Sequence, residues 1–330
     1  MTNATLRRRA ALVGLLAAPS LAYGQTAAPI RLLVNGTPGS ISDILCRTLA
    51  ERLRERLGRP IVPDNRSGAG GFASVLGARG QPADGSVLVQ ANIGVTALAP
   101  LVFRRPPIDP DAELAPICHL TESPFGLAVR ADAPGLDRAG GGTLQGWLAA
   151  MRARGGGEVA VNSATGLPRF MVHRLSAVSG VPLTPVIYRS SGAMLPDLEA
   201  GHVPAGLTIG GEFIEQHRAG RLRLLAQSLG EGRWSLAPEV PRFNEQGLGD
   251  FVASAWNGLF APAGLPEARA LAIAAAVTAA LHAPEALAKL RPMGLEPTGG
   301  TPAQLRARIA ADRARWAPVI EASGFKADEP

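Results

Sequence analysis

The sequence predicts an α/β fold of two units, each a mostly parallel sheet with helices on its faces. The first observation is size: 330 residues, 46% of them hydrophobic and 18% charged, supply enough apolar side chain for two domains of roughly 150 residues each. The second is the distribution of turn-forming residues: 39 glycines and 28 prolines follow no period and separate short apolar runs. Such runs, alternating as strand and helix, are typical of parallel sheets.

The amino terminus has the layout of a secretory signal peptide. Three arginines at positions 7–9 precede an apolar stretch from Ala10 to Ala18, and a small-residue pattern ends at Gly24. The stretch is too short to span a membrane. We therefore expect residues 1–24 to direct export to the periplasm, by either the general or the twin-arginine route.

The charge balance argues against a nucleic-acid partner. Without the three arginines of the leader, the formal net charge falls from +6 to +3. The rest of the chain has no run of basic residues with interleaved aromatics, which nucleic-acid binding would need.

The first unit begins with a strand, a glycine-containing loop and a helix. The apolar run 30–34 predicts a buried strand, residues 35–40 a turn-rich loop, and leucines at helical spacing a helix from Ser42 that ends at Gly58. The first N–H groups of a helix have no internal partner and lie at the positive end of its dipole. This loop is therefore the first candidate for binding an anion.

The remaining elements repeat this order. Strands are predicted at 60–62, 87–89, 127–129, 159–161, 185–187, 206–209 and 222–226. Helices are predicted from the second glycine loop toward residue 78, and near 143–153, 167–179, 192–200 and 211–219. The last ninety residues are predicted to be mainly helical, over 266–281, 284–290 and 302–322, and to return to cover the first unit.

No set of residues points to an enzyme. Residues 68–73 loosely fit a dinucleotide fingerprint, but Gln90 and Asn92 stand where the acidic ribose acceptor is expected. His173 lies in an apolar helical pattern and is predicted to be a partly exposed helix histidine. Glu212 and Glu215, three residues apart, are predicted to form a solvated helix face. We expect no catalytic residue, cofactor or metal.

Two cysteines remain after this search. Cys46 and Cys118 both lie in apolar surroundings, which favours buried, unpaired thiols, although a single disulfide between them stays open.

Several short motifs are similar, in order and spacing, to the Bug family, the periplasmic solute-binding proteins of tripartite tricarboxylate transporters. The matching motifs are Pro29-Ile30-Arg31, Pro38-Gly39, Asn65-Arg66 before the glycines 68–71, Asp84-Gly85, Trp256-Asn257-Gly258 and Gly299-Gly300-Thr301-Pro302. The resemblance covers residues 29 to about 325.

The resemblance implies a two-domain, periplasmic-binding-protein-like fold of type II, the Venus flytrap. Residues 29–124 and 230–330 would form domain I, and residues 125–229 domain II. Such a protein, a monomer, would close on a small carboxylate and deliver it to integral membrane permease subunits. Two alternatives stay open: a ligand sensor that docks on a membrane receptor, and a periplasmic enzyme.

The resemblance also implies the site. The ligand would be held by the loop after the first strand and by the corresponding loop of domain II. The candidate ligand-binding residues are Gly36, Thr37, Pro38, Gly39, Ser40, Asp43, Asn92, Asn162, Ser163, Thr165, Gly166 and Gly210. Asp43 has a second interpretation, as a charge that interacts with the helix dipole.

The chain departs from the family pattern near this site. Gly36 replaces an aromatic residue, Ser40 a glycine, and Phe72 an asparagine, while Gly210 lies where the family often carries a pocket aspartate or asparagine. We hypothesise that the loss of bulk at Gly36 and the aromatic at Phe72 favour a larger dicarboxylate or an aromatic carboxylate.

Overall fold

The computed structural model describes residues 28–68, 71–136 and 142–328, so the predicted signal peptide lies outside it. Its strands follow one path in the order β2-β1-β3-β9-β4-β7-β5-β6, with β8 and β10 also paired to β4. The strands are β1 (Ile30–Val34), β2 (Ile61–Asn65), β3 (Val87–Asn92), β4 (Leu114–Arg130), β5 (Gly157–Val161), β6 (Leu183–Ile187), β7 (Ala205–Ile209), β8 (Leu222–Gln227), β9 (Ser254–Pro262) and β10 (Glu296–Gly299).

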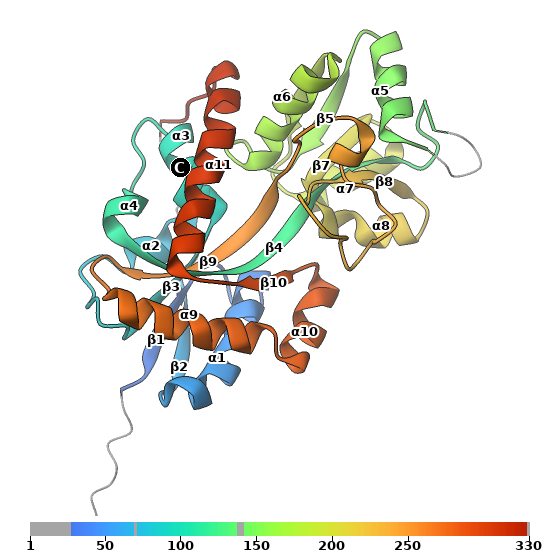
Figure 1. The fold of residues 1–330 in the computed structure, drawn as a ribbon. Helices are drawn as coiled ribbons and strands as arrows, with labels where there is room; N and C mark the ends of the chain where they lie inside the picture. The colour runs from blue at the N-terminus through green and yellow to red at the C-terminus, as the bar shows by residue number, and fades with distance from the viewer. Residues whose placement is uncertain (1–27, 69–70, 137–141, 329–330) are drawn as a thin grey trace, which may run out of the picture.

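Helices flank both parts of this sheet (Figure 1). The α-helices are α1 (Ile41–Leu57), α2 (Ala73–Leu76), α3 (Ala99–Val102), α4 (Pro110–Glu113), α5 (Leu144–Ala153), α6 (Leu167–Ser179), α7 (Ser191–Ala200), α8 (Ile214–Arg218), α9 (Glu267–Leu281), α10 (Pro284–Leu290) and α11 (Pro302–Ala322). Short turns of other helix types, named for the described residues, are η2 (Gly94–Leu98), η3 (Gly210–Phe213), η4 (Asn244–Gln246) and η5 (Arg291–Met293).

The first half of the molecule has a sheet with a hydrophobic core on each face. In β1, Leu32 and Val34 face the core beneath α1, α9 and α10, while Leu33 faces the opposite core beneath α2, α3 and α11. This alternation follows from the two-residue period of a strand. Because β1 pairs in parallel with β2 and β3, the carboxyl ends of these three strands lie at one edge.

The second half repeats this plan. The strands β5, β6 and β7 are parallel neighbours. Trp147 of α5 and Phe170 of α6 fill the core on one face, and Met194 of α7 and Phe213 of η3 fill the core on the other. The carboxyl ends of these strands form a second open edge.

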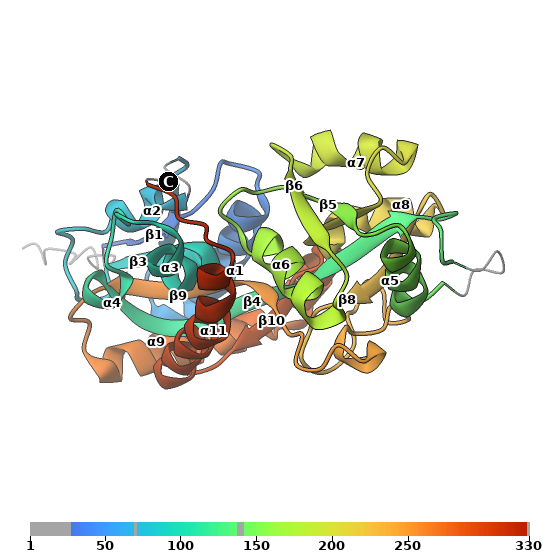
Figure 2. The same cartoon turned by 90° about the horizontal axis from the view of Figure 1, so that it is seen from above.

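The 17-residue strand β4 joins the halves. Its residues Leu114 to Pro124 pair with β9, and its residues Phe125 to Arg130 pair with β7 and β8. In Figures 1 and 2 the strand runs from one half into the other. Ser228, fully buried, holds the crossing point: its Oγ accepts from the Phe125 N–H at 2.9 Å and donates to the Ala253 carbonyl at 2.6 Å.

Most predicted elements are confirmed within a few residues, including the three carboxyl-terminal helices that return to cover the first half. The first part of β4, β9 and β10 were missed. The helix after the second glycine loop is confined to Ala73–Leu76.

Both cysteines are free and buried, as predicted. Burial raises the pKa of the Cys118 thiol to about 12 and that of the Cys46 thiol further. Among the described residues no single helix is long and apolar enough to cross a bilayer; the bent pair α9 and α10 meets that length and composition only together.

Candidate functional site

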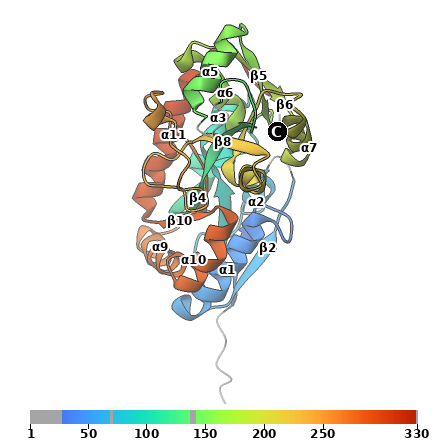
Figure 3. The same cartoon turned by 90° about the vertical axis from the view of Figure 1, so that its right-hand side faces the viewer.

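The two open sheet edges supply the candidate site. In a sheet of parallel strands, ligands bind outside the carboxyl ends, where the loops meet. In Figures 2 and 3 the segment that leads into α1 and the helix α7 lie on the same side of the molecule. One segment follows β1 and the other follows β6, so each half contributes a loop at a strand's carboxyl end.

The loop after β1 is held in place by hydrogen bonds to side chains of the neighbouring strands. The Asn35 N–H donates to Gln90 Oε1 at 2.9 Å, and Gln90 Nε2 donates to Asn257 Oδ1 at 2.6 Å. Asn65 Nδ2 donates to the Gly36 carbonyl at 3.2 Å. Gln90, fully buried on β3, thus connects the loop to β9. Such buried contacts give the loop a defined geometry before any ligand arrives.

The start of α1 leaves backbone donors free. The Ser40 side chain accepts from the Asp43 N–H at 3.3 Å, and the Ser40 carbonyl accepts from the Ile44 N–H at 2.9 Å. The N–H groups of Ile41 and Ser42 have no acceptor within the helix. Together with the dipole of a 17-residue helix, they form a site suited to an anion.

The exposed tip of this loop is made of the predicted residues Thr37, Pro38 and Gly39. Gly39 adopts a φ of 80°, a left-handed conformation that glycine tolerates best. Gly36 and Ser40 are half-buried at its base. The structure thus brings five of the predicted residues together at the amino end of α1.

Asp43 stabilises this loop from within. Its buried carboxylate accepts from the Gly39 N–H and from Arg47 Nε, both at 2.9 Å. Burial raises the pKa of this carboxyl. The hydrogen bonds from Arg47 and Gly39 together lower the pKa by more than burial raises it, so the pKa lies below its usual value. The geometry favours the helix-charge interpretation over ligand contact.

The loops of the second half are arranged around Glu212 of η3. Glu212 Oε2 accepts from Thr208 Oγ1 at 2.8 Å, from Asn162 Nδ2 at 3.2 Å, and from Ser191 Oγ. Asn162 Nδ2 also donates to Ser191 Oγ at 2.9 Å. Asn162 follows β5, Ser191 begins α7 and Thr208 lies near the end of β7, so one carboxylate joins three segments of the chain.

The other predicted residues of this half have local roles. Ser163 Oγ accepts from the Gly166 N–H at 2.9 Å, and Gly166 begins α6. Thr165 is half-buried in the same turn. Because Pro168 has no N–H, α6 offers fewer free donors than α1.

The last two predicted site residues, Asn92 and Gly210, lie beside these loops. Asn92 ends β3, and its Oδ1 accepts from the Val95 N–H at 3.2 Å. Gly210 is buried at the junction of the halves, where a Cβ would lie 3.1 Å from the Trp234 ring and 3.4 Å from the Pro124 carbonyl. Only a glycine fits there without displacement of its neighbours.

Two interpretations from the sequence were wrong. Phe72 does not line a pocket: it is 1% exposed and packs edge-on against Phe103 in the core, with ring centroids 6.0 Å apart. Glu212 is not part of a solvated face, because three side chains donate to it, although Glu215 is exposed as predicted. His173 is a half-buried helix residue, as predicted.

Ser191, Thr208 and Gln90 were missed as site residues. They come from separate segments of the chain. The only sequence signals were the places of Gln90 and Thr208 directly after, or near the end of, predicted strands, and of Ser191 directly before a predicted helix. Trp256, which belongs to one of the matching motifs, is a core residue and is 1% exposed.

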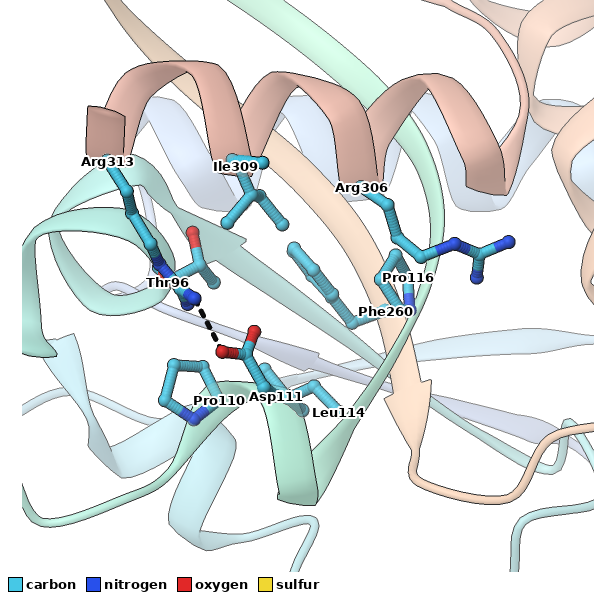
Figure 4. A pocket seen from close by; sticks show the side chains of 10 residues that line it. Thr96, Pro110, Asp111, Leu114, Pro116, Phe260, Arg306, Ile309 and Arg313 are labelled. Carbon is cyan, nitrogen blue, oxygen red and sulfur yellow. Dashed lines mark hydrogen bonds and ion pairs between the residues drawn. The ribbon is translucent and has the colours of Figure 1, made fainter. Parts of the chain in front are cut away.

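The cavity drawn in Figure 4 lies elsewhere. It has a volume of about 280 Å³ and is lined by α4, the first residues of β4, the end of β9 and the inner side of α11. Arg313 and Asp111 form an ion pair across it, marked in Figure 4. The amino end of β4 and the loops described above are not neighbours in this sheet, so we assign the cavity no part in the candidate site.

Two α/β halves that share a long strand, with loops opposed at the strands' carboxyl ends, define the class of two-domain solute-binding proteins. A family model described as "Tripartite tricarboxylate transporter family receptor" matches residues 45–325. The chain therefore belongs to this family of periplasmic receptors, and the resemblance seen in the sequence is confirmed.

Individual relatives agree. Protein BugT of Bordetella pertussis is 29% identical over 313 residues, which cover 94% of each chain. A solved structure of R. palustris Rpa4515 with adipate has 27% identity and a TM-score of 0.74, covering 92% of this chain and 99% of that one. MatC of Rhodopseudomonas palustris with bound malate has 25% identity and a TM-score of 0.69, over 89% and 99%. The fold class is confirmed by these structures.

Proposed function

We propose that this chain is an exported, non-enzymatic receptor that captures a small carboxylate between two domains and delivers it to membrane permease subunits. The observation that supports the proposal is the start of α1. There a loop held by hydrogen bonds, residues 35–40, presents two free N–H groups at the positive end of the helix. Two family neighbours are solved with adipate and malate, both carboxylates. The predicted leader, residues 1–24, would place the monomeric mature protein in the periplasm.

The proposed domains are residues 29–124 with 230–330, and residues 125–229. The pairing of β4 supports this division, since its partner changes from β9 to β7 and β8 between Pro124 and Phe125. After β8, which ends at Gln227, the chain returns to the first domain. Closure would bring the second-domain loops, with Ser163 and Gly166, toward a carboxylate already bound at α1.

The test is a binding screen with a variant that blocks the anion site. The mature protein should show saturable binding of at least one carboxylate, with a rise in melting temperature and recovery of the ligand unchanged. Ser42→Asp places a negative charge at the second position of α1. That charge favours the helix by about 0.3 to 1 kcal/mol but repels the ligand, so carboxylate affinity should fall by about tenfold or more.

Ala303→Asp is the matched control. Ala303 is exposed at the same position of α11, far along the chain from the loop. It should leave carboxylate binding unchanged. Equal binding by wild type and Ser42→Asp would remove the α1 loop from the site, and conversion of the ligand would contradict a receptor role.

A further inference from the structure

Among the described residues, the side chains around Glu212 use their donors on one another and leave acceptors free. Both hydrogens of the Asn162 amide are used, on Ser191 Oγ and on Glu212 Oε2. The hydroxyl hydrogens of Ser191 and Thr208 are used on the same carboxylate oxygen. What remains is oxygen: among the described residues, Glu212 Oε1 and Asn162 Oδ1 take part in no hydrogen bond.

In the described part of the chain, Glu212 has no cationic partner. None of the ion pairs formed by the described residues includes Glu212. Arg189, close to Ser191 in sequence, is exposed and is not joined to it. Three side chains donate to one of its oxygens, and Glu212 is an acidic residue whose charge a ligand has to meet.

Glu212 also lies where the two domains meet. It follows Gly210 and Gly211 in η3; Gly210 borders the Pro124 carbonyl of β4, and a Cβ on Gly211 would lie 3.9 Å from the Met293 carbonyl of domain I. Glu212 is half-buried. It is therefore at the domain boundary, at the carboxyl ends of β5 and β7.

We propose that Glu212 is a specificity-determining residue that selects carboxylates carrying an ammonium group over dicarboxylates of the same length. This inference rests on the proposed function, because the ligand's carboxylate is taken to bind at α1. The far end of the ligand then meets a negatively charged carboxylate whose cluster leaves only side-chain acceptors free. An ammonium group donates to Glu212 Oε1 and Asn162 Oδ1, whereas a second carboxylate is repelled by Glu212 and finds no free side-chain donor in the cluster.

The spacer between these groups would meet apolar side chains. Ile41, the first residue of α1, is 51% exposed, and Ile187, the last residue of β6, is 42% exposed. Both stand next to the loops of the site, one from each domain. Unbranched aliphatic acids are therefore the simplest probes.

The test compares three unbranched acids that differ only at the far end. The six-carbon set is adipate, 6-aminohexanoate and hexanoate; the four-carbon set is succinate, 4-aminobutanoate and butanoate. Affinities are measured by calorimetry for the wild-type mature protein and for Glu212→Gln. Wild type should prefer the amino acid over the dicarboxylate of the same length by about tenfold or more, and Glu212→Gln should lose most of that preference.

Glu215→Gln is the control. Glu215, three residues further on, is 80% exposed and lies 4.0 Å from Arg218, so its neutralisation changes net charge equally without touching the cluster. It should retain the preference for the ammonium group, and melting curves establish that each variant is folded at the temperature of the titration.

The outcomes separate the two proposals. Carboxylate binding in which Glu212→Gln leaves the ratio of amino acid to dicarboxylate unchanged overturns the role of Glu212 but not the receptor function. A wild-type protein that prefers the dicarboxylate also overturns the role of Glu212. A wild type that binds other carboxylates in the screen but none of the six acids overturns the inference alone, whereas no binding of any carboxylate contradicts the proposed function and the inference with it.

Discussion

Gly36 and Ser40 act as a pair, although the sequence presents them as two separate departures from the family pattern. A Cβ on Gly36 would lie 2.5 Å from Ser40 Oγ, well inside van der Waals contact. Ser40 needs that space because its Oγ caps α1 at the Asp43 N–H. The missing bulk at position 36 therefore follows from the cap, which is a reason unrelated to the size of the ligand.

This pairing predicts non-additive stability changes. Gly36→Ala should displace the Ser40 hydroxyl and lower the free energy of unfolding by about 1 kcal/mol, the usual cost of losing an N-cap. In a Ser40→Gly background the same change should be neutral or stabilising by about 0.5 kcal/mol, because alanine reduces the entropy of the unfolded chain. Urea denaturation of the four proteins gives the coupling. Additive effects would separate the two residues.

The candidate site was predictable where it is local and unpredictable where it is not. The anion site at α1 is built within eight residues of β1, so strand, loop and helix start could be recognised together. The Glu212 cluster joins positions 162, 191 and 208 across 50 residues. Its assembly depends on the order of β6, β5 and β7 in the sheet, which no local pattern records.

At the scale of elements, β4 and β9 explain why strand prediction failed in the middle of the molecule. The first part of β4 contains Pro116 and Pro124, residues that weaken a strand pattern. It is a strand because β9, more than a hundred residues later, pairs with it from Leu114 to Pro124, with irregular register near Pro116. Short buried strands such as β1 need no such partner to be recognised.

Burial within β4 predicts a pH effect on stability. His119 lies edge-on to Trp256 of β9, with ring centroids 5.7 Å apart. Burial lowers the pKa of His119 to about 4, and the charge of Arg308 adds to this, while Asp312 opposes it. In the unfolded chain a histidine pKa is about 6.5. The unfolded state therefore binds the extra proton first, and stability falls as pH decreases from about 6.5 to 4.

The measurement is the free energy of unfolding at several pH values for wild type and His119→Gln. The variant should lose less stability than wild type between pH 6.5 and 4.5, a range above the titration of most carboxylates. His282→Gln, at an exposed histidine after α9, should follow wild type. A parallel fall for wild type and His119→Gln would show that this histidine does not titrate differently on unfolding.

For the whole molecule, the topology limits how the halves can move. The path of β4 through both sheet parts is unbroken, and Ser228 bonds it to the chain that returns into β9. Rotation about this crossing point changes the distance between the loops while each core keeps its packing. If the chain functions as proposed, a bound carboxylate would favour a closed form, because only that form would add contacts from the second domain.

Small-angle scattering tests this closure directly. Saturation of the mature protein with a carboxylate that binds should reduce the radius of gyration, because the loops of domain II approach α1. The same concentration should contract Ser42→Asp less than wild type, since that variant binds the anion about tenfold or more weakly. Ala303→Asp should contract as wild type does. Binding shown by calorimetry without any contraction in wild type would mean that the ligand occupies one domain alone, and that the shared strand β4 acts as a rigid support and not as a hinge.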